Sequence, residues 1–160
     1  MAIKQFIGVI SDTHGLLRPE AMKALRGSDL IIHAGDIGKP EVIETLRSMA
    51  PVVAVRGNND KGRWARKFPE TAVVELGEVL IYVIHDVKEL EIDPAAAGFR
   101  VVISGHSHRP SITKRNGVLF LNPGSAGPRR FNLPVAVAQL RVRDQSVSAR
   151  IVELAVNKRT

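Results

Sequence analysis

The sequence contains no cysteine among its 160 residues, which excludes disulfide bonds, thiolate zinc sites and cysteine nucleophiles. Any metal ion would therefore be held by histidine, aspartate, glutamate or asparagine side chains. Aromatic residues make up only 4% of the chain and follow no cofactor-binding pattern. No apolar run reaches the ~20 residues that a membrane-spanning helix needs. The first residues also show no secretory signal pattern, so we expect a cytoplasmic protein without membrane contact.

The composition is typical of a globular domain. With 44% hydrophobic residues the chain can bury a core, and it has no internal repeat, low-complexity linker or shift in composition. We therefore predict a single domain over residues 1–160. The formal net charge of +7 comes from scattered basic residues, which favours a solvated basic surface over a nucleic-acid interface.

The first sixty residues alternate between strand-like and helix-like patterns. Pro40 suits the first turn of a helix, and Pro51 ends that helix before the next strand. Such alternation predicts parallel strands joined by crossover helices. The expected strands are 6–10, 30–32 and 52–55, and the expected helices are 18–25 and 40–49.

The second part of the chain consists mainly of short strand-like runs with turn signals between them. A single helix is expected there, near residues 89–97. This number of strands predicts an α/β fold in which two packed β-sheets are flanked by helices, an α-β-β-α sandwich. The strand-like runs are "TAVVEL", "VLIYVI", "RVVIS", "SITK", "VLFLN", "VAVAQLRV" and "SARIVEL".

Polar clusters follow five of the apolar runs. In α/β sheets the carboxyl ends of parallel strands share one edge, so we expect these clusters to meet in one crevice. The glycine at position 15 lets the chain turn away directly after the first cluster. The clusters read "SDTHG", "HAGD", "RGNND", "IHD" and "SGHSH".

Four of the five histidines lie in these clusters, namely His14, His85, His106 and His108. Buried imidazoles and carboxylates are costly unless they are hydrogen-bonded or bound to a metal, and one metal centre would compensate all of them together. The pattern therefore predicts a metal site. The fifth histidine, His33, lies within a strand and is interpreted as a core residue or one that supports the ligands from behind.

The ordered motifs D-x-H, G-D, G-N-x-D, H and G-H-x-H resemble those of the calcineurin-like metallophosphoesterase superfamily. They cover residues 12–108, and "NPGS" at 122–125 is similar to the small single-domain phosphodiesterase branch found in bacteria and archaea. This resemblance implies a metallophosphoesterase-like fold and a metal-dependent phosphoric ester hydrolase.

The resemblance also implies a role for each motif residue. Asp12, His14 and His108 would bind one metal, whereas Asn58, His85 and His106 would bind the other, and Asp36 would bridge the two. Thiolate-free nitrogen and oxygen ligands suit Mn, which we expect first, and also Fe, Zn, Co or Ni. Two cations ~3.5–4 Å apart would turn a bridging water into hydroxide and clamp the phosphoryl oxygens. The implied substrates are small phosphodiesters or nucleotides.

Two residues depart from the family pattern. Many relatives have histidine where this chain has Asn59, which can donate a hydrogen bond but cannot transfer a proton to a leaving group at neutral pH. Relatives commonly read H-G-H where this chain has Asp86 and Val87 after His85. We expect Asp86 to accept a hydrogen bond from behind the second metal. Asp36, Asn58 and Asn59 are thus the residues closest to catalysis.

Two other functions remain open at this stage. The first is a protein-binding scaffold with little activity, because the retromer subunit of this fold resembles the chain in length and terminal motifs. The second is a nuclease, suggested by the net charge and by Arg63, Arg66 and Lys67 after "GNND". Either a monomer or a homo-oligomer is compatible with the sequence.

Overall fold

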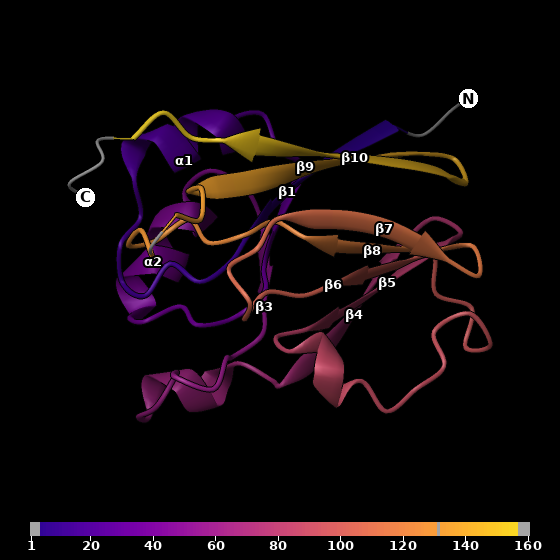
Figure 1. Cartoon of the computed structure of the whole chain (residues 1–160), viewed down its shortest axis with the longest axis horizontal. Coiled ribbons are helices and arrows are strands. Elements are labelled where there is room, and N and C mark those ends of the chain that lie inside the picture. The colour runs from indigo at the N-terminus through magenta and orange to yellow at the C-terminus, as the bar shows by residue number, and fades with distance from the viewer. Residues whose placement is uncertain (1–3, 131, 157–160) are drawn as a thin grey trace.

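A computed structural model describes residues 4–130 and 132–156 of the chain. Two five-stranded sheets form its centre (Figure 1). In the first sheet the strand order is β10-β9-β1-β2-β3, with β1 parallel to β2 and β2 parallel to β3. Its strands are β1 (Lys4–Ile10), β2 (Leu30–His33), β3 (Val52–Ala54), β9 (Ala136–Arg143) and β10 (Ser146–Glu153).

The second sheet has the order β4-β5-β6-β8-β7, in which β5, β6 and β8 are parallel neighbours. Its edge strands β4 and β7 are both antiparallel to their partners. The strands are β4 (Thr71–Leu76), β5 (Val79–Ile84), β6 (Val101–Ile103), β7 (Ser111–Arg115) and β8 (Val118–Asn122). Both sheets therefore place the carboxyl ends of several parallel strands where the polar clusters begin.

The two sheets pack face to face, which confirms the predicted α/β fold with two packed sheets. Val9 and Ile32 of the first sheet belong to the same buried cluster as Ile81 and Ile103 of the second. Helices α1 (Pro19–Leu25) and α2 (Pro40–Arg47) cover the outer face of the first sheet through a separate buried cluster that includes Leu25. Both helices begin with proline at their first position, where no N–H donor is lost.

The outer face of the second sheet is covered differently from what the sequence predicts. The prediction of a helix near residues 89–97 is wrong. The structure has only the short 3-10 helix η2 (Val87–Glu89) there, followed by turns. Pro94 lacks an N–H donor and Gly98 adopts a φ of +89°, so the segment cannot propagate a regular helix. A second 3-10 helix, η1 (Trp64–Lys67), follows the "GNND" cluster and was not predicted.

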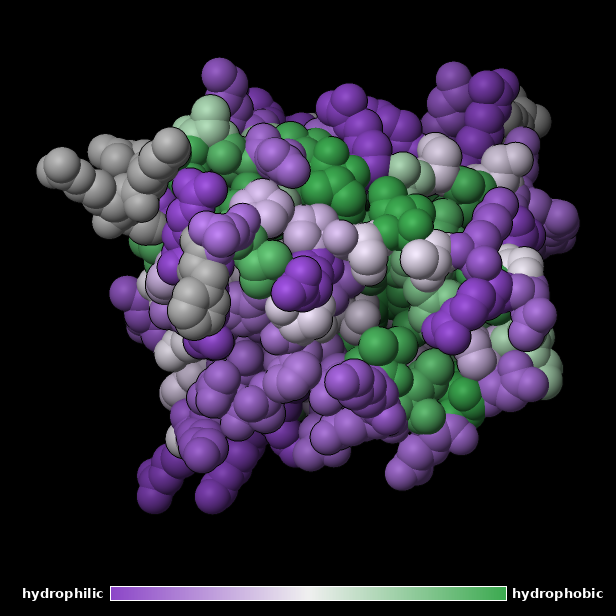
Figure 2. All heavy atoms as spheres, viewed as in Figure 1, coloured by the Kyte–Doolittle hydropathy of each residue, from purple (hydrophilic) through white to green (hydrophobic). Residues whose placement is uncertain are grey.

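Hydrophobic side chains reach the surface in several places. Figure 2 shows them in the upper middle and on the right of the view, among hydrophilic side chains. Beneath the outer face of the second sheet, Ile84, Val102 and Val118 form a small buried cluster, against which Tyr82 and Phe120 pack while partly exposed. Within the described residues, none of the helices is long and apolar enough to cross a membrane.

Candidate metal centre

The five polar clusters meet at the carboxyl ends of β1, β2, β3, β5 and β6. Backbone hydrogen bonds join the loops that carry them: Asp12 N donates to Gly35 O at 2.9 Å and His14 N donates to Asp36 O at 2.9 Å. Gly105 N donates to His85 O, also at 2.9 Å. The structure thus brings together all seven residues that the sequence predicts as ligands.

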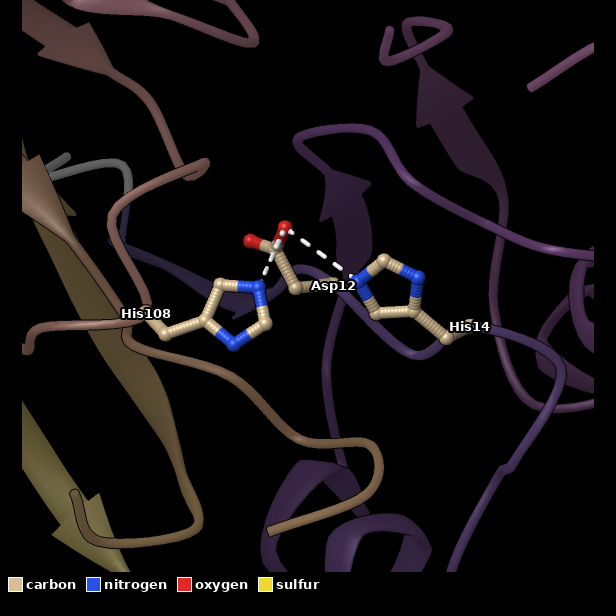
Figure 3. A group of neighbouring side chains, drawn as sticks. All are labelled: Asp12, His14 and His108. Atoms are coloured by element: carbon tan, nitrogen blue, oxygen red, sulfur yellow. Dashed lines mark ion pairs between the residues drawn. The ribbon is translucent and has the colours of Figure 1, made fainter. Parts of the chain in front are cut away.

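Asp12 lies at the centre of the first group, which also contains His14 and His108. Figure 3 shows the two imidazole rings on either side of the Asp12 carboxylate. The Nε2 atoms of His14 and His108 lie 3.8 Å and 3.3 Å from Asp12 Oδ1. Asp12 Oδ2 accepts hydrogen bonds from Ser11 Oγ at 2.7 Å and from His106 N at 3.1 Å. Asp12 Oδ1 is therefore the oxygen that faces the histidines.

Asp36 belongs to a second group, formed by Asp12, Asp36 and His85, which shares Asp12 with the first. Its Oδ2 atom is 3.7 Å from His14 Nε2 and 3.3 Å from His85 Nε2. Asp36 thus contacts a histidine of each group, as a bridging ligand requires. Asp12 Oδ1 also lies near both histidines, 3.8 Å from His14 Nε2 and 3.9 Å from His85 Nε2.

Asn58 and His106 extend the second group toward solvent. Asn58 Oδ1 lies 3.3 Å from His106 Nδ1, and the ring centroids of His85 and His106 are 5.2 Å apart. Both Asn58 and His106 are exposed, in contrast to the buried Asp12 and His85. This side of the centre is therefore open to a ligand from solution.

The donor atoms fit divalent cations. Within the described residues, four buried side-chain nitrogen and oxygen atoms have no hydrogen-bond partner, and all four belong to predicted ligands. Ligands at ~2.1 Å from one ion lie ~3.0–3.4 Å from each other, close to the separations observed around Asp12 and Asp36. Buried polar atoms without partners are costly, and bound cations would remove that cost for Asp12, His14 and His85, while His108 turns its other nitrogen, Nε2, toward Asp12. The four atoms are Asp12 Oδ1, His14 Nε2, His85 Nε2 and His108 Nδ1.

The hydrogen bonds of His85 fix its tautomer. Its Nδ1 lies 2.7 Å from Ala34 O, and because a carbonyl can only accept, Nδ1 carries the proton and Nε2 faces the carboxylates. Without a cation, burial alone would lower the pKa of His85, but Asp36 and Asp12 outweigh burial and raise it to about 9. Burial likewise opposes ionisation of Asp36, yet contacts with His85 and Asn59 hold the pKa of Asp36 below its usual range. For His14, burial dominates and lowers the pKa.

Asn59 contacts Asp36 directly. Its backbone N donates to Asp36 Oδ1 at 2.9 Å, and its side-chain Nδ2 donates to Asp36 Oδ2 at 3.1 Å. These two bonds orient the carboxylate between His14 and His85. Asn59 therefore supports Asp36 in this structure, in addition to lying next to Asn58.

Asp86 lies behind His106. Its Oδ1 accepts from Lys88 N at 3.0 Å and caps η2, while its Oδ2 lies 3.7 Å from His106 Nε2. The Nδ1 atom of the same ring faces Asn58, so the Asp86 carboxylate lies on the opposite side of the ring from the second group.

Five of the predicted ligands hold a left-handed backbone conformation, which non-glycine residues seldom adopt. Such strain is typical of functional sites, where the surrounding structure maintains it. Among the other non-glycine residues that the structure describes, a positive φ occurs at the hairpin turns of Asn116 and Asp144. The five ligands, with their φ values, are Asp12 (55°), His14 (46°), Asp36 (55°), His106 (70°) and His108 (63°).

Sequence reasoning missed the residues that hold the loops together. Asp60, the last residue of "GNND", accepts hydrogen bonds from the backbone N of Ile37, Gly38 and Gly57 at 2.8–3.0 Å. A Cβ at Gly57 would collide with Asp36, which explains why glycine opens this cluster. An acidic residue directly after two asparagines in a strand-end loop is the available signal, because such residues commonly accept from nearby backbone N–H groups.

His33 is fully buried and supports the loop of Asp12 and His14. Gly35 N donates to His33 Nδ1 at 3.1 Å, so His33 Nε2 carries the proton and donates to Thr13 Oγ1 at 2.9 Å. Thr13 Oγ1 in turn donates to Ile37 O at 2.8 Å. His33 is thus a neutral core residue behind the site, as interpreted from the sequence.

Protonation of His33 should destabilise the fold. Burial lowers the pKa of His33 to about 4, whereas the unfolded chain titrates near 6.5. Below pH ~6.5 the unfolded state binds a proton that the folded state does not, so stability falls by up to roughly 3 kcal/mol as the pH drops to ~4. We expect His33→Gln to weaken this dependence, as measured by urea unfolding in chelator at several pH values. If His33→Gln lowers the free energy of unfolding by the same amount at every pH, so that the pH dependence of the parent protein is retained, this account is contradicted.

Comparisons with known proteins agree with this geometry. Residues 6–145 match the model of the calcineurin-like phosphoesterase superfamily domain. A "probable metallophosphoesterase" of Methanothermobacter thermautotrophicus is 35% identical, over 91% of this chain and 91% of that protein. A phosphodiesterase of Methanocaldococcus jannaschii is 30% identical, over 74% of this chain and 82% of that protein. The Vps29 structure from Chaetomium thermophilum has a TM-score of 0.80 at 22% identity, covering 97% and 91% of the two chains.

The chain therefore belongs to the calcineurin-like phosphoesterase superfamily, as its motifs predict. Within that superfamily it is a metallophosphoesterase, an enzyme that hydrolyses phosphoric esters with the help of divalent metal ions. The likeness to Vps29 concerns the fold alone.

Proposed function

We propose that this protein is a dinuclear phosphodiesterase that hydrolyses small phosphodiesters or nucleotides. The observation that supports this function best is the set of buried, unpartnered atoms around Asp12 and Asp36, namely Asp12 Oδ1, His14 Nε2 and His85 Nε2. In the proposed site, one cation is held by Asp12, His14 and His108 and the other by Asn58, His85 and His106, with Asp36 shared between them. Mn is the first metal to test, followed by Fe, Zn, Co and Ni.

The residues of this chain have separate roles in the proposed reaction. When bound, two divalent cations supply a water that is deprotonated at neutral pH and neutralise charge on the phosphoryl oxygens. Asp36 holds the two ligand groups at a fixed separation, and Asn59 fixes the Asp36 carboxylate through two hydrogen bonds. The exposed Asn58 and His106 mark the side from which the phosphodiester enters. We place the protein in the cytoplasm, with a small phosphoester as its partner.

Metal stoichiometry tests this proposal. Seven ligating side chains are too many for one ion that must also bind water, so metal-saturated protein should hold close to two ions per chain by elemental analysis. His106→Ala should lower this value toward one, whereas Lys114→Ala, an exposed change on β7, should leave it at two. A value of one in the parent protein, with His85 and His106 free of metal in anomalous diffraction, would overturn the dinuclear site.

The protein-binding scaffold remains the alternative because of the fold shared with Vps29. The full set of ligating residue types favours the enzyme, since a scaffold has no need of it. The nuclease hypothesis rests on Arg63, Arg66 and Lys67, which the structure places on or beside η1. Oligonucleotide binding that weakens with salt would support it.

A further inference from the structure

A cleft of about 920 Å³ opens beside the second ligand group, and Asn58, His85 and His106 form one end of it. At this end, the side chain of His85 is only 7% exposed and its Nε2 atom has no hydrogen-bond partner. A polar ligand atom that enters the cleft can therefore find an unsatisfied nitrogen there. The volume lies within the range of small-molecule sites and is much larger than a phosphate group needs. The cleft can therefore hold an organic group that is attached to the phosphate.

The cleft continues over the outer face of the second sheet, where η2 and the turns after it leave side chains accessible. Its lining there includes the apolar Ile84 and Leu90 and the ring of Tyr82. Phe99 packs edge-on against this ring, with a centroid separation of 5.2 Å and an interplanar angle of 73°. Tyr82 is thus held in place and offers a fixed aromatic surface to a ligand.

The charge of the lining differs in sign from that of the whole chain. The chain carries a formal charge of +7, but the cleft is lined by more carboxylates than cations. Of the two lining cations, Arg56 is engaged by Glu70 at 3.1 Å and also donates to Phe68 O at 2.9 Å, which leaves Lys88. The lining carboxylates are Glu70, Asp86, Glu89 and Glu91.

We propose that this cleft binds one ester group of the phosphodiester and selects a group that has an apolar face and carries no negative charge. The inference rests on the proposed phosphodiesterase function. Tyr82 and Leu90 would pack against the apolar face, while the glutamates would accept hydrogen bonds from hydroxyl groups, attract an ammonium charge and repel a further phosphate. Nucleosides and amino alcohols share this chemistry, whereas polynucleotide backbones and nucleotides with a second phosphate do not.

Four aryl phosphodiesters with the same p-nitrophenolate leaving group separate binding from chemistry. Their other ester group is methyl, choline, thymidine through its 5′ oxygen, or the same thymidine with a 3′-phosphate. We expect choline or thymidine to lower KM relative to methyl, and the better of the two identifies the source of the group. The 3′-phosphate should raise KM by about fivefold relative to plain thymidine at low salt, and by less at high salt.

Two pairs of variants assign these effects to the cleft. Glu89→Gln/Glu91→Gln should remove most of the penalty of the 3′-phosphate. The control Glu75→Gln/Glu153→Gln changes the charge equally at exposed positions on β4 and β10 and should preserve the penalty. Tyr82→Ala should raise KM for the preferred ester by about tenfold relative to the methyl ester, whereas Tyr82→Phe retains the ring and the preference.

The outcomes distinguish the two proposals. If no aryl phosphodiester is hydrolysed with any of the metals, the phosphodiesterase function fails. If the methyl ester is hydrolysed but KM is the same for all four esters, the cleft assignment alone is overturned. The cleft assignment is also overturned if both double variants remove the penalty of the 3′-phosphate equally. The same holds if Tyr82→Ala raises KM equally for all four esters.

Discussion

We expect Asp36→Ala to lower the rate of phosphodiester hydrolysis by on the order of 10³-fold, because the substitution removes the carboxylate that we propose as the bridge between the two ions. Asp36 Oδ2 lies 3.7 Å from His14 Nε2 and 3.3 Å from His85 Nε2, whereas Asp12 Oδ1, the other carboxylate oxygen near both histidines, is farther from each, at 3.8 Å and 3.9 Å. The residue lies in the loop after β2 rather than in the core, so the fold should persist. Turnover of an aryl phosphodiester and circular dichroism measure the two effects.

Asp36→Asn is the matched variant, since it keeps the size of the side chain and one acceptor for Asn59 but removes the charge. It should also lose most of the activity if the charge is what holds the cations. Elemental analysis of both variants should show a lower metal content than that of the parent protein. Retained turnover in Asp36→Ala would overturn the bridging role, and an unfolded metal-free variant would make the residue structural.

The second large effect concerns the leaving group. At position 59 the chain has asparagine, whose amide donates to Asp36 Oδ2 at 3.1 Å and cannot transfer a proton at neutral pH. Aryl phosphodiesters, whose phenolate departs without protonation, should therefore be cleaved at least ~10²-fold faster than alkyl diesters of similar size. Steady-state rates for a series of leaving groups with different pKa values measure this dependence.

Asn59→His is the informative variant for this prediction. A well-placed imidazole should accelerate the alkyl diesters selectively, by up to ~10²-fold. Asn59→Ala is its control, because it removes the side-chain hydrogen bond to Asp36 Oδ2 without adding an acid, and it should slow both classes of ester alike. An equal effect of Asn59→His on aryl and alkyl esters would show that protonation of the leaving group is not limiting.

Strand-end motifs made the site predictable from the sequence. Asp12, His14 and Asp36 each lie within four residues of the end of β1 or β2, and parallel pairing of these strands brings their ends together. The same reasoning places His85 and His106 together, because β5 and β6 are parallel neighbours. Periodicity and the carboxyl-edge rule were sufficient there, since both depend only on local pattern and strand direction.

The cleft and its lining could not be predicted in the same way. Residues 89–97 have helical composition, but tertiary context and Pro94 favour turns, and the outer face of the second sheet is left accessible as a result. Arg56 and Tyr82 come from different parts of the chain and share the cleft only through the packing of loops. Contacts of this kind depend on long-range geometry, for which single-residue patterns carry no signal.

The left-handed backbone at five ligand positions bears on how such a protein changes over generations. Each strained position costs about 1 kcal/mol or more that only the function of the site justifies, and glycine or asparagine accepts the same φ with little strain. A descendant that no longer needs hydrolysis can therefore replace His14 or His108 and lose no stability, or even gain some, while both sheets stay intact. Loss of catalysis is then a step that stability does not oppose, and it leaves both sheets and their surface free for other uses.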